Sequence, residues 1–182
     1  MTLLSNNNIR LRPLEPEDLD LLYEWENDSS LWTSGSTVSP YSRYTLKKYI
    51  AQSHLDIYEI RQLRLMIELI DAPAKGAGLI DLYDFDPHNS KAAIGILVGA
   101  DHQGKGIAGQ ALALLVDYAF SFLKLHQLYA YIPVTNKASN NLFRRCGFIP
   151  SGTLTDWVST SEGFTNVLFV QRINETDQWK TS

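Results

Sequence analysis

The residues best suited to chemistry form a glycine-bearing stretch between an apolar run and an amphipathic segment. Residues 99–109 read GADHQGKGIAG, and glycines without a Cβ let the backbone approach a ligand closely. Residues 92–98 are apolar and of strand length, and from residue 107 to about 123 apolar residues recur at helical spacing. A helix that starts directly after such a loop presents unpaired N–H groups and the positive end of its dipole. We therefore expect residues 99–109 to bind a phosphate or pyrophosphate.

Two common phosphate motifs do not match this stretch. The dinucleotide fingerprint needs three glycines at fixed spacing after a first strand, and the P-loop needs Gly-Lys followed by Ser or Thr. Residues 103–108 instead match Gln/Arg-x-x-Gly-x-Gly/Ala, and here the chain resembles the GNAT acetyltransferase superfamily. The alternative for the hexapeptide alone is a tight strand-to-helix turn without a ligand. A second stretch, residues 136–148 (NKASNNLFRRCGF), is similar to another segment of that family.

The expected order of elements agrees with the same resemblance. The pattern predicts an edge strand at 9–14, helices at about 16–26 and 43–59, and strands at 64–70 and 77–83. A polar turn at 84–90 leads to the central strand at 92–98, which is expected to be buried on both faces. After the long helix, a strand at 127–132, a helix at 137–145 and strands at 148–153 and 166–173 complete the chain. The resemblance implies an α/β (α+β) GNAT fold: one domain over residues 1–182, with a mixed, mostly antiparallel sheet and a splayed central strand.

Composition limits the classes of partner. The 182 residues carry a formal charge of −4 without a basic tract, which argues against nucleic acid as the main partner. No apolar run reaches about 18 residues, so no membrane association is expected. Cys146 is the only cysteine, which excludes an intramolecular disulfide and favours a cytoplasmic location. The four histidines lack metal-ligand spacing, so we predict no metal site.

The resemblance implies acetyl-coenzyme A as the cofactor and assigns residues to it. In the family the pantetheine arm pairs with the central strand, which corresponds to the backbone of Ile96, Leu97 and Val98. The pyrophosphate loop corresponds to Gln103, Gly104, Lys105, Gly106, Ile107, Ala108 and Gly109. The second motif adds Asn136, Phe143 and Arg145.

The implied reaction is attack of a primary amine on the acetyl thioester, which passes through a tetrahedral oxyanion. The N–H of Val98 is the expected oxyanion donor. The attacking ammonium must lose a proton, since at a pKa near 10.4 only about one molecule in a few thousand is neutral at pH 7. The glutamate that many relatives carry on the central strand corresponds to Ala93, and Asp81 is the preferred substitute. The alternative for Asp81 is an exposed carboxylate at a strand end.

The departing thiolate needs a proton or must leave unassisted. The family's tyrosine acid corresponds to Phe143, which cannot donate a proton, so Tyr83, Tyr129, Tyr131 or water is expected to replace it. Trp32 and Tyr131 are candidate acceptor-binding residues beside Asp81. Cys146 as an acetyl-carrying nucleophile is a minor alternative to simple packing.

Among the subfamilies, the chain looks most like the spermidine (diamine) acetyltransferases, with the ribosomal-protein N-terminal acetyltransferases next. The expected partner is therefore a small-molecule amine such as spermidine, and a homo-oligomer is possible because related enzymes commonly pair or form rings. A peptide or aminoglycoside acceptor stays open. From another class, a non-catalytic acyl-coenzyme A sensor is the rival, because Phe143 and Ala93 replace two family residues.

Overall fold

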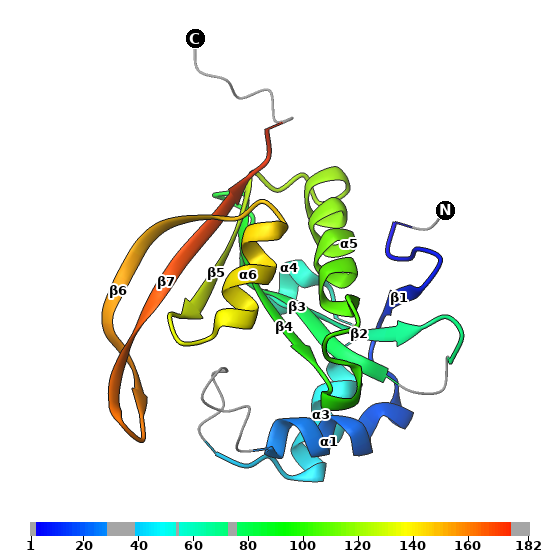
Figure 1. Cartoon of the computed structure of the whole chain (residues 1–182). Coiled ribbons are helices and arrows are strands. Elements are labelled where there is room, and N and C mark those ends of the chain that lie inside the picture. Colours follow the sequence, from blue (N-terminus) through cyan, green and yellow to red (C-terminus); the bar gives the residue numbers. More distant parts are fainter. Residues whose placement is uncertain (1–2, 29–38, 54, 73–75, 176–182) are drawn as a thin grey trace.

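The computed structural model describes residues 3–28, 39–53, 55–72 and 76–175, which build a seven-stranded sheet with helices on both faces (Figure 1). The strands are β1 (Ile9–Arg12), β2 (Leu63–Leu69), β3 (Gly76–Asp86), β4 (Lys91–Val98), β5 (Gln127–Pro133), β6 (Ile149–Thr160) and β7 (Gly163–Ile173). The helices are α1 (Leu19–Asn27), α3 (Arg43–Gln52), α4 (Ile57–Ile60), α5 (Ile107–Ser121) and α6 (Lys137–Arg145), with 3-10 turns η1 (Pro16–Asp18) and η2 (Ala100–His102). The strand order is β1-β2-β3-β4-β5-β7-β6, and among the described strands only β4 and β5 pair in parallel. This confirms the expected mixed, mostly antiparallel sheet.

Alternate residues of β2 and β3 point to opposite faces of the sheet, and each face has its own helices. Leu65 and Ile80 belong to the core that α5 and α6 cover. Met66 and Leu79 belong to a second, smaller core with residues of α1 and α3. The two faces are therefore called the α5 face and the α1 face below.

The central strand separates from its parallel neighbour. β4 pairs with β5 at Lys91, Ala92 and Ala93, and beyond these residues the two strands splay apart (Figure 1). Ile94 is still buried, whereas residues 95–98 are half-buried. Burial of the whole strand on both faces was thus a wrong expectation: the strand lines an opening along its second half.

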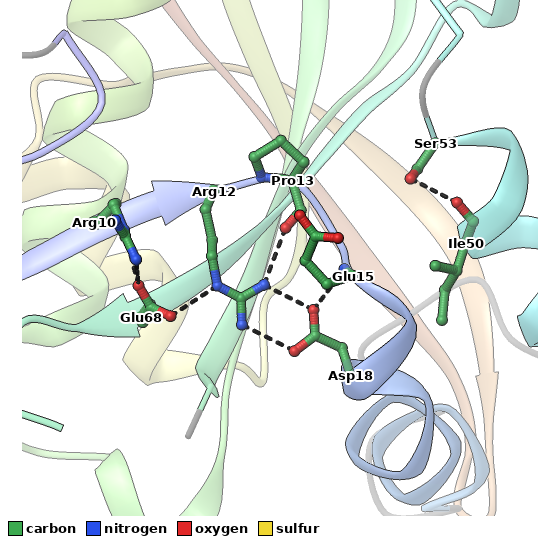
Figure 2. A network of polar contacts seen from close by, with 8 residues as sticks. All are labelled: Arg10, Arg12, Pro13, Glu15, Asp18, Ile50, Ser53 and Glu68. Carbon is green, nitrogen blue, oxygen red and sulfur yellow. Dashed lines mark hydrogen bonds and ion pairs between the residues drawn. The ribbon is translucent and has the colours of Figure 1, made fainter. Parts of the chain in front are cut away.

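The helix expected over 43–59 is also wrong, because the chain forms two helices there. The Ser53 hydroxyl donates 2.7 Å to the carbonyl of Ile50 at the end of α3 (Figure 2). Asp56 then caps α4 by accepting from the N–H of Tyr58 at 2.7 Å. Serine and aspartate side chains satisfy backbone groups at these ends, so the apolar spacing did not mark one continuous helix.

Several boundaries lie outside the expected ranges. β3 continues to Asp86 through a bulge at which Asp84 adopts φ 49°, so the polar turn is shorter than residues 84–90. β6 and β7 form a longer hairpin than expected, with a register shift between Leu154 and Val158. α5 ends at Ser121. Phe122, which apolar periodicity assigned to the helix, is 61% exposed.

A polar network fixes the first strand and the start of α1 (Figure 2). Glu68 of β2 accepts hydrogen bonds from Arg10 and from Arg12 of β1. The Arg12 guanidinium also donates to both carboxylate oxygens of Asp18, at 2.7 and 2.9 Å. Burial alone would raise the pKa of Asp18, but the Arg12 hydrogen bonds and the Glu15 N–H hold it below its usual value. Burial also favours a higher pKa for Glu68, but the hydrogen bonds and charges of Arg12 and Arg10 outweigh it, so the pKa of Glu68 is lowered.

Candidate functional site

A cavity of about 1320 Å³ opens where β4 and β5 separate. Residues 94–98 of β4 and 130–133 of β5 line its two walls. The start of α5 and the inner side of α6 line it on one face of the sheet, and Trp25, Glu26 and Asp81 line it on the other. The cavity therefore connects the α5 face to the α1 face through the gap between the two strands.

The second half of β4 turns alternate backbone groups toward this gap. The N–H of Gly99 donates to the carbonyl of Ala77 at 2.9 Å, so odd-numbered residues of β4 direct their backbone groups at β3. Leu97 is one of these, and it lines the cavity without offering its own N–H to the gap. Ile96 and Val98 have the opposite orientation, and their N–H groups point to the side where β5 has diverged. On that side, the side-chain amide of Gln103 donates a hydrogen bond to the Val98 carbonyl at 3.0 Å.

The loop before α5 has the conformation that its glycines predict. Gly104 and Gly106 adopt φ 72° and φ 75°, values that other residues rarely take, and a Cβ at either position would meet no atom within 4 Å. The constraint is therefore in the backbone and not in the space around it. The first intrahelical bond of α5 runs from Gln110 to Gly106, which leaves earlier N–H groups at the helix start for an anion.

The predicted loop residues do not all reach the cavity. Its lining contains Gln103, Gly104, Gly106, Ile107, Ala108 and Gly109. Lys105 is exposed and outside that lining, so its charge faces solvent in this structure. His102, which sequence alone assigned to a solvated turn, does line the cavity.

The second motif lines the same face through α6. Asn136 caps this helix by accepting from the N–H of Ser139 at 3.0 Å, so its amide oxygen has a structural partner. Phe143 is 3% exposed, and its ring packs edge-on against Phe148 with centroids 5.0 Å apart. Arg145 lies exposed at the cavity rim. Phe143 is thus a core residue that contributes one apolar edge to the cavity wall.

Asp81 is buried in the middle of β3, which excludes the exposed strand-end alternative. It is 9% exposed, lies opposite Gly95 of β4, and points to the α1 face because Leu79, two residues earlier, does so. A Cβ on Gly95 would lie 2.8 Å from Asp81 Oδ1, so only glycine leaves room for this carboxylate. Ala93, the position that corresponds to the family glutamate, is fully buried between Tyr83 and the parallel strand. The carboxylate at this point of the sheet is therefore supplied by β3.

Two side chains contact the Asp81 carboxylate. The Gln62 amide donates 3.2 Å to Oδ2, and Arg64 Nη2 lies 3.6 Å from the same oxygen. Arg64 also pairs with Glu26 of α1 at 2.7 Å and lies over the ring of Tyr49, 5.5 Å from its centroid. Oδ1 accepts no hydrogen bond from any residue that the structure describes. Burial raises the pKa of Asp81, and Arg64 and Gln62 only partly offset that effect.

The candidate tyrosines lie on the α1 face with Asp81. Tyr83 lines the cavity, and burial, followed by the nearby Asp81 charge, raises the pKa of its hydroxyl. Tyr131 is 43% exposed and also lines the cavity, with its ring 5.7 Å from that of Tyr129. Tyr129 itself is buried outside the lining, and burial raises its pKa to about 12. Tyr83 is therefore the candidate closest in the sheet to Asp81.

Some functional candidates were missed or cannot be placed. Trp32 lies outside the described residues. Glu26 and Arg64 were read only as parts of a helix and a strand, and the signal that could have found them is the hairpin register that sets Arg64 opposite Asp81. Trp157, 62% exposed and in the cavity lining, follows a bulge at which the preceding residue takes φ 50°. It was missed because the last two strands were predicted too short.

Within the described ranges, no group of three or more His, Cys, Asp or Glu residues is placed to hold a metal ion. None of the helices described is long and apolar enough to cross a membrane. Cys146 lines the cavity at the end of α6, and burial raises the pKa of its thiol. A raised pKa disfavours the thiolate that an acetyl-carrying cysteine would need.

Comparison with known families shows which family the chain belongs to. The family model described as "Acetyltransferase (GNAT) domain" matches residues 8–149. The chain belongs to the GNAT acetyltransferase family. It is an N-acetyltransferase that depends on acetyl-CoA. The splayed strand, the glycine loop and the start of α5 fit that cofactor, because they combine unpaired strand N–H groups with an anion site along one cavity.

Individual relatives cover most of the chain. The spermidine N(1)-acetyltransferase of Escherichia coli K12 is 29% identical over 153 residues, which span 82% of this chain and 77% of the relative. The putative ribosomal N-acetyltransferase YdaF of Bacillus subtilis is 30% identical over 166 residues, 83% of each chain. Among solved structures, the spermidine N-acetyltransferase of Vibrio cholerae in complex with CoA and spermine superposes with a TM-score of 0.82. It is 25% identical, and the match covers 92% of this chain and 96% of that one.

Proposed function

We propose that this GNAT enzyme acetylates a primary amine of a polyamine such as spermidine, with Asp81 as the residue that receives the ammonium. The observation that carries the proposal is the buried Asp81 carboxylate, whose Oδ1 faces the cavity beside β4 without a partner among the described residues. A buried carboxylate with one unpaired oxygen favours a cationic guest, because an ammonium would supply both the charge and the hydrogen bond. The names of the Escherichia coli and Vibrio cholerae relatives support a polyamine as that guest.

The cofactor side of the cavity is assigned to the α5 face. Bound acetyl-CoA supplies the activated acetyl thioester. The N–H groups of Ile96 and Val98 are available for the pantetheine arm and for the acyl oxygen, respectively, because both point into the gap beside β4. The N–H groups at the start of α5 and the preceding loop are available for the pyrophosphate. Asn136 and Arg145 would add contacts at the rim, Phe143 would add apolar surface, and Lys105, which is exposed outside the lining, would add positive charge nearby.

The acceptor side is assigned to the α1 face. The approaching ammonium binds Asp81 Oδ1 and gives its proton to that carboxylate or to water, which leaves a neutral amine to attack. The raised pKa of Asp81 makes it a stronger base than an exposed aspartate. Val98 N–H stabilises negative charge that develops on the acyl oxygen. Tyr131 and Trp32 are proposed to contact the acceptor beside Asp81.

Tyr83 is proposed to protonate the departing thiolate. Phe143, at the position of the family's tyrosine acid, cannot donate a proton and is buried in the core on the α5 face. Tyr83 lines the cavity on the acceptor side and carries its proton at neutral pH, although burial raises its pKa and makes it a weaker acid than an exposed tyrosine. A thiolate is a tolerable leaving group even without help, so the contribution of Tyr83 is expected to be partial.

A second acceptor class has direct support from the comparisons. The YdaF relative is described as a putative ribosomal N-acetyltransferase, and its identity to this chain, 30%, is close to the 29% of the Escherichia coli spermidine enzyme. A protein N-terminus also presents a primary amine. The two classes differ in size and charge, so a panel of acceptors separates them.

A relative's structure also supports a proposal about the assembly of the enzyme. The Vibrio cholerae spermidine N-acetyltransferase has been solved in a dodecameric form, with a structure 25% identical to this chain and a TM-score of 0.78. We expect this chain to form a homo-oligomer as well. One domain per chain, a cytoplasmic location and the lack of nucleic-acid or membrane partners remain predictions from the sequence.

The test is thiol release from acetyl-CoA, detected with a thiol reagent, across polyamines, aminoglycosides and peptides with ribosomal-protein N-termini. Spermidine or a close polyamine should give the highest kcat/KM. A higher kcat/KM for a peptide would contradict the polyamine assignment and favour a protein N-terminus as the acceptor. Binding of CoA without turnover of any amine would contradict the enzyme and favour an acyl-CoA sensor.

A further inference from the structure

Arg64 holds an unusual place for a cation, because it lies in a cavity that we assign to a cationic acceptor. It projects from β2 on the α1 face and lines the cavity together with its two acidic neighbours. Its side chain is 24% exposed, and those of Glu26 and Asp81 are 15% and 13% exposed. A guanidinium here would repel an ammonium unless its charge were already balanced.

The contacts of Arg64 show how that balance is reached. Nη1 makes the short contact of 2.7 Å to Glu26, whereas Nη2 lies 3.6 Å from Asp81. Arg64 and Glu26 therefore form the closer pair, and the cluster of three charges keeps one net negative charge on Asp81. The guanidinium also lies over the Tyr49 ring, 5.5 Å from its centroid, within the range of a cation–π contact.

The guanidinium also fixes which oxygen of Asp81 is available. Arg64 and Gln62 both approach Oδ2, which leaves Oδ1 directed at the space that Gly95 provides. Arg64 Nε is buried and has no hydrogen-bond partner among the described residues, which costs free energy of folding. An apolar side chain at this position would pack without that cost. A binding or catalytic role for Asp81 gives a reason to keep this costly arrangement.

We propose that Arg64 is a positioning residue for acetyl transfer: anchored by Glu26, it keeps the Asp81 carboxylate charged and turned with Oδ1 toward the acceptor. The inference rests on the proposed function, because Asp81 must act on the ammonium for its orientation to matter. Arg64 itself touches neither the acceptor nor the cofactor in this role.

The inference predicts opposite effects of the two neighbours on the acid limb of the pH–kcat/KM profile. Asp81 is faced by Arg64 from β2, Glu26 from α1, Tyr49 from α3 and Tyr83 from its own strand. Arg64→Gln removes the nearby positive charge, so Asp81 protonates at higher pH and the limb moves up by about one pH unit. Glu26→Gln removes a negative charge and leaves Arg64 to Asp81, so the limb moves to lower pH. A merely structural role would not give shifts of opposite sign.

The experiment measures kcat/KM for spermidine at saturating acetyl-CoA from about pH 5 to pH 10 for wild type, Arg64→Gln, Arg64→Lys and Glu26→Gln. All variants share one substrate, so the ionisation of spermidine is common to every profile. Arg64→Lys should stay closer to wild type than Arg64→Gln. The matched control is Arg43→Gln, which removes an arginine from the exposed pair with Asp20 and should leave the limb in place.

The outcomes separate the inference from the function on which it rests. Shifts in the same direction, or no shift in either variant, would overturn the role of Arg64. If Arg64→Gln does not fold, Glu26→Gln still decides, since a limb that stays or rises contradicts the proposal. Asp81→Asn measured beside them shows whether Asp81 matters. Full activity in Asp81→Asn refutes the proposed role of Asp81. Lost activity in Asp81→Asn, together with unshifted acid limbs in Arg64→Gln and Glu26→Gln, refutes only the role of Arg64.

Discussion

Gly95→Ala tests whether β4 must leave room for the Asp81 carboxylate. The added Cβ would lie 2.8 Å from Oδ1, 3.4 Å from Cγ and 3.7 Å from Oδ2. Ordinary carbon–oxygen contacts begin near 3.4 Å, so Oδ1 must move by several tenths of an ångström. Turning an aspartate about 30° away from its rotamer costs about 0.5–1.5 kcal/mol. The protein should fold, with its carboxylate displaced.

The displacement should reduce catalysis more than stability. A misplacement of about 1 Å can cost about 100-fold in rate, so a smaller shift is expected to lower kcat/KM by roughly 10-fold or more. The assay is thiol release with spermidine, combined with urea unfolding to check the fold. Gly152→Ala is the matched control, because a Cβ in that β6 position meets no atom within 4 Å.

A double variant shows whether the methyl group acts through Asp81. If it does, Gly95→Ala should cost little further activity in an Asp81→Asn background, so the two effects will not add. An additive loss would mean that the methyl group obstructs the cavity directly. Wild-type kcat/KM in the single variant would refute the proposed position of Oδ1.

Three further predictions follow from the site and the fold. Tyr83→Phe should lower kcat by about 100-fold if Tyr83 is the general acid, and leave the KM for acetyl-CoA nearly unchanged. Gly106→Ala should raise the KM for acetyl-CoA and cost about 1 kcal/mol of stability, because φ 75° is unfavourable for alanine. Arg12→Gln should cost about 3 kcal/mol in urea unfolding at pH 7, since it leaves the buried Asp18 carboxylate without its guanidinium partner and leaves Glu68 with Arg10 alone. Both have lowered folded-state pKa values, so this stabilisation is complete above about pH 5 and is lost as the pH falls through those values.

Tyr83→Phe has a matched control, and Arg12→Gln has a test by pH. Tyr58→Phe removes an exposed tyrosine hydroxyl outside the cavity and should leave kcat unchanged. Unchanged kcat in Tyr83→Phe as well would mean that water or another group protonates the thiolate. For Arg12→Gln, a loss of stability that is equal at pH 7 and at about pH 3 would contradict the ion-pair explanation.

The sequence predicted most of the fold because its strong signals are local. Apolar periodicity defined α5, and the glycines of residues 104–106 marked the left-handed loop before it. The helix over 43–59 failed because caps at Ser53 and Asp56 interrupt a continuous apolar spacing. Periodicity measures which side of a segment is apolar and does not detect where its backbone bonds end.

The acceptor side could be predicted only in part, because it depends on register and on the docking of α1. Asp81 was identified from its place on the strand before the central one and from the resemblance to polyamine acetyltransferases, which carry an acidic residue near that position. Its burial, its partner Arg64 and the contact with Glu26 come from three separate elements, and no local pattern reports their distances. The role of Gly95 requires knowing which residue of β3 lies opposite it.

Turnover of spermidine by Asp81→Asn, with CoA binding measured on the same protein, is the most direct test of the mechanism. Asparagine keeps the size of the side chain and its contact with Gln62 but cannot take a proton or pair with an ammonium. We predict that CoA binds as it does to wild type, because Asp81 lies on the face opposite α5, while kcat/KM for spermidine falls by at least about 100-fold. Wild-type kcat/KM in this variant would contradict the role of Asp81, and a parallel loss of CoA binding would contradict the separation of the two faces.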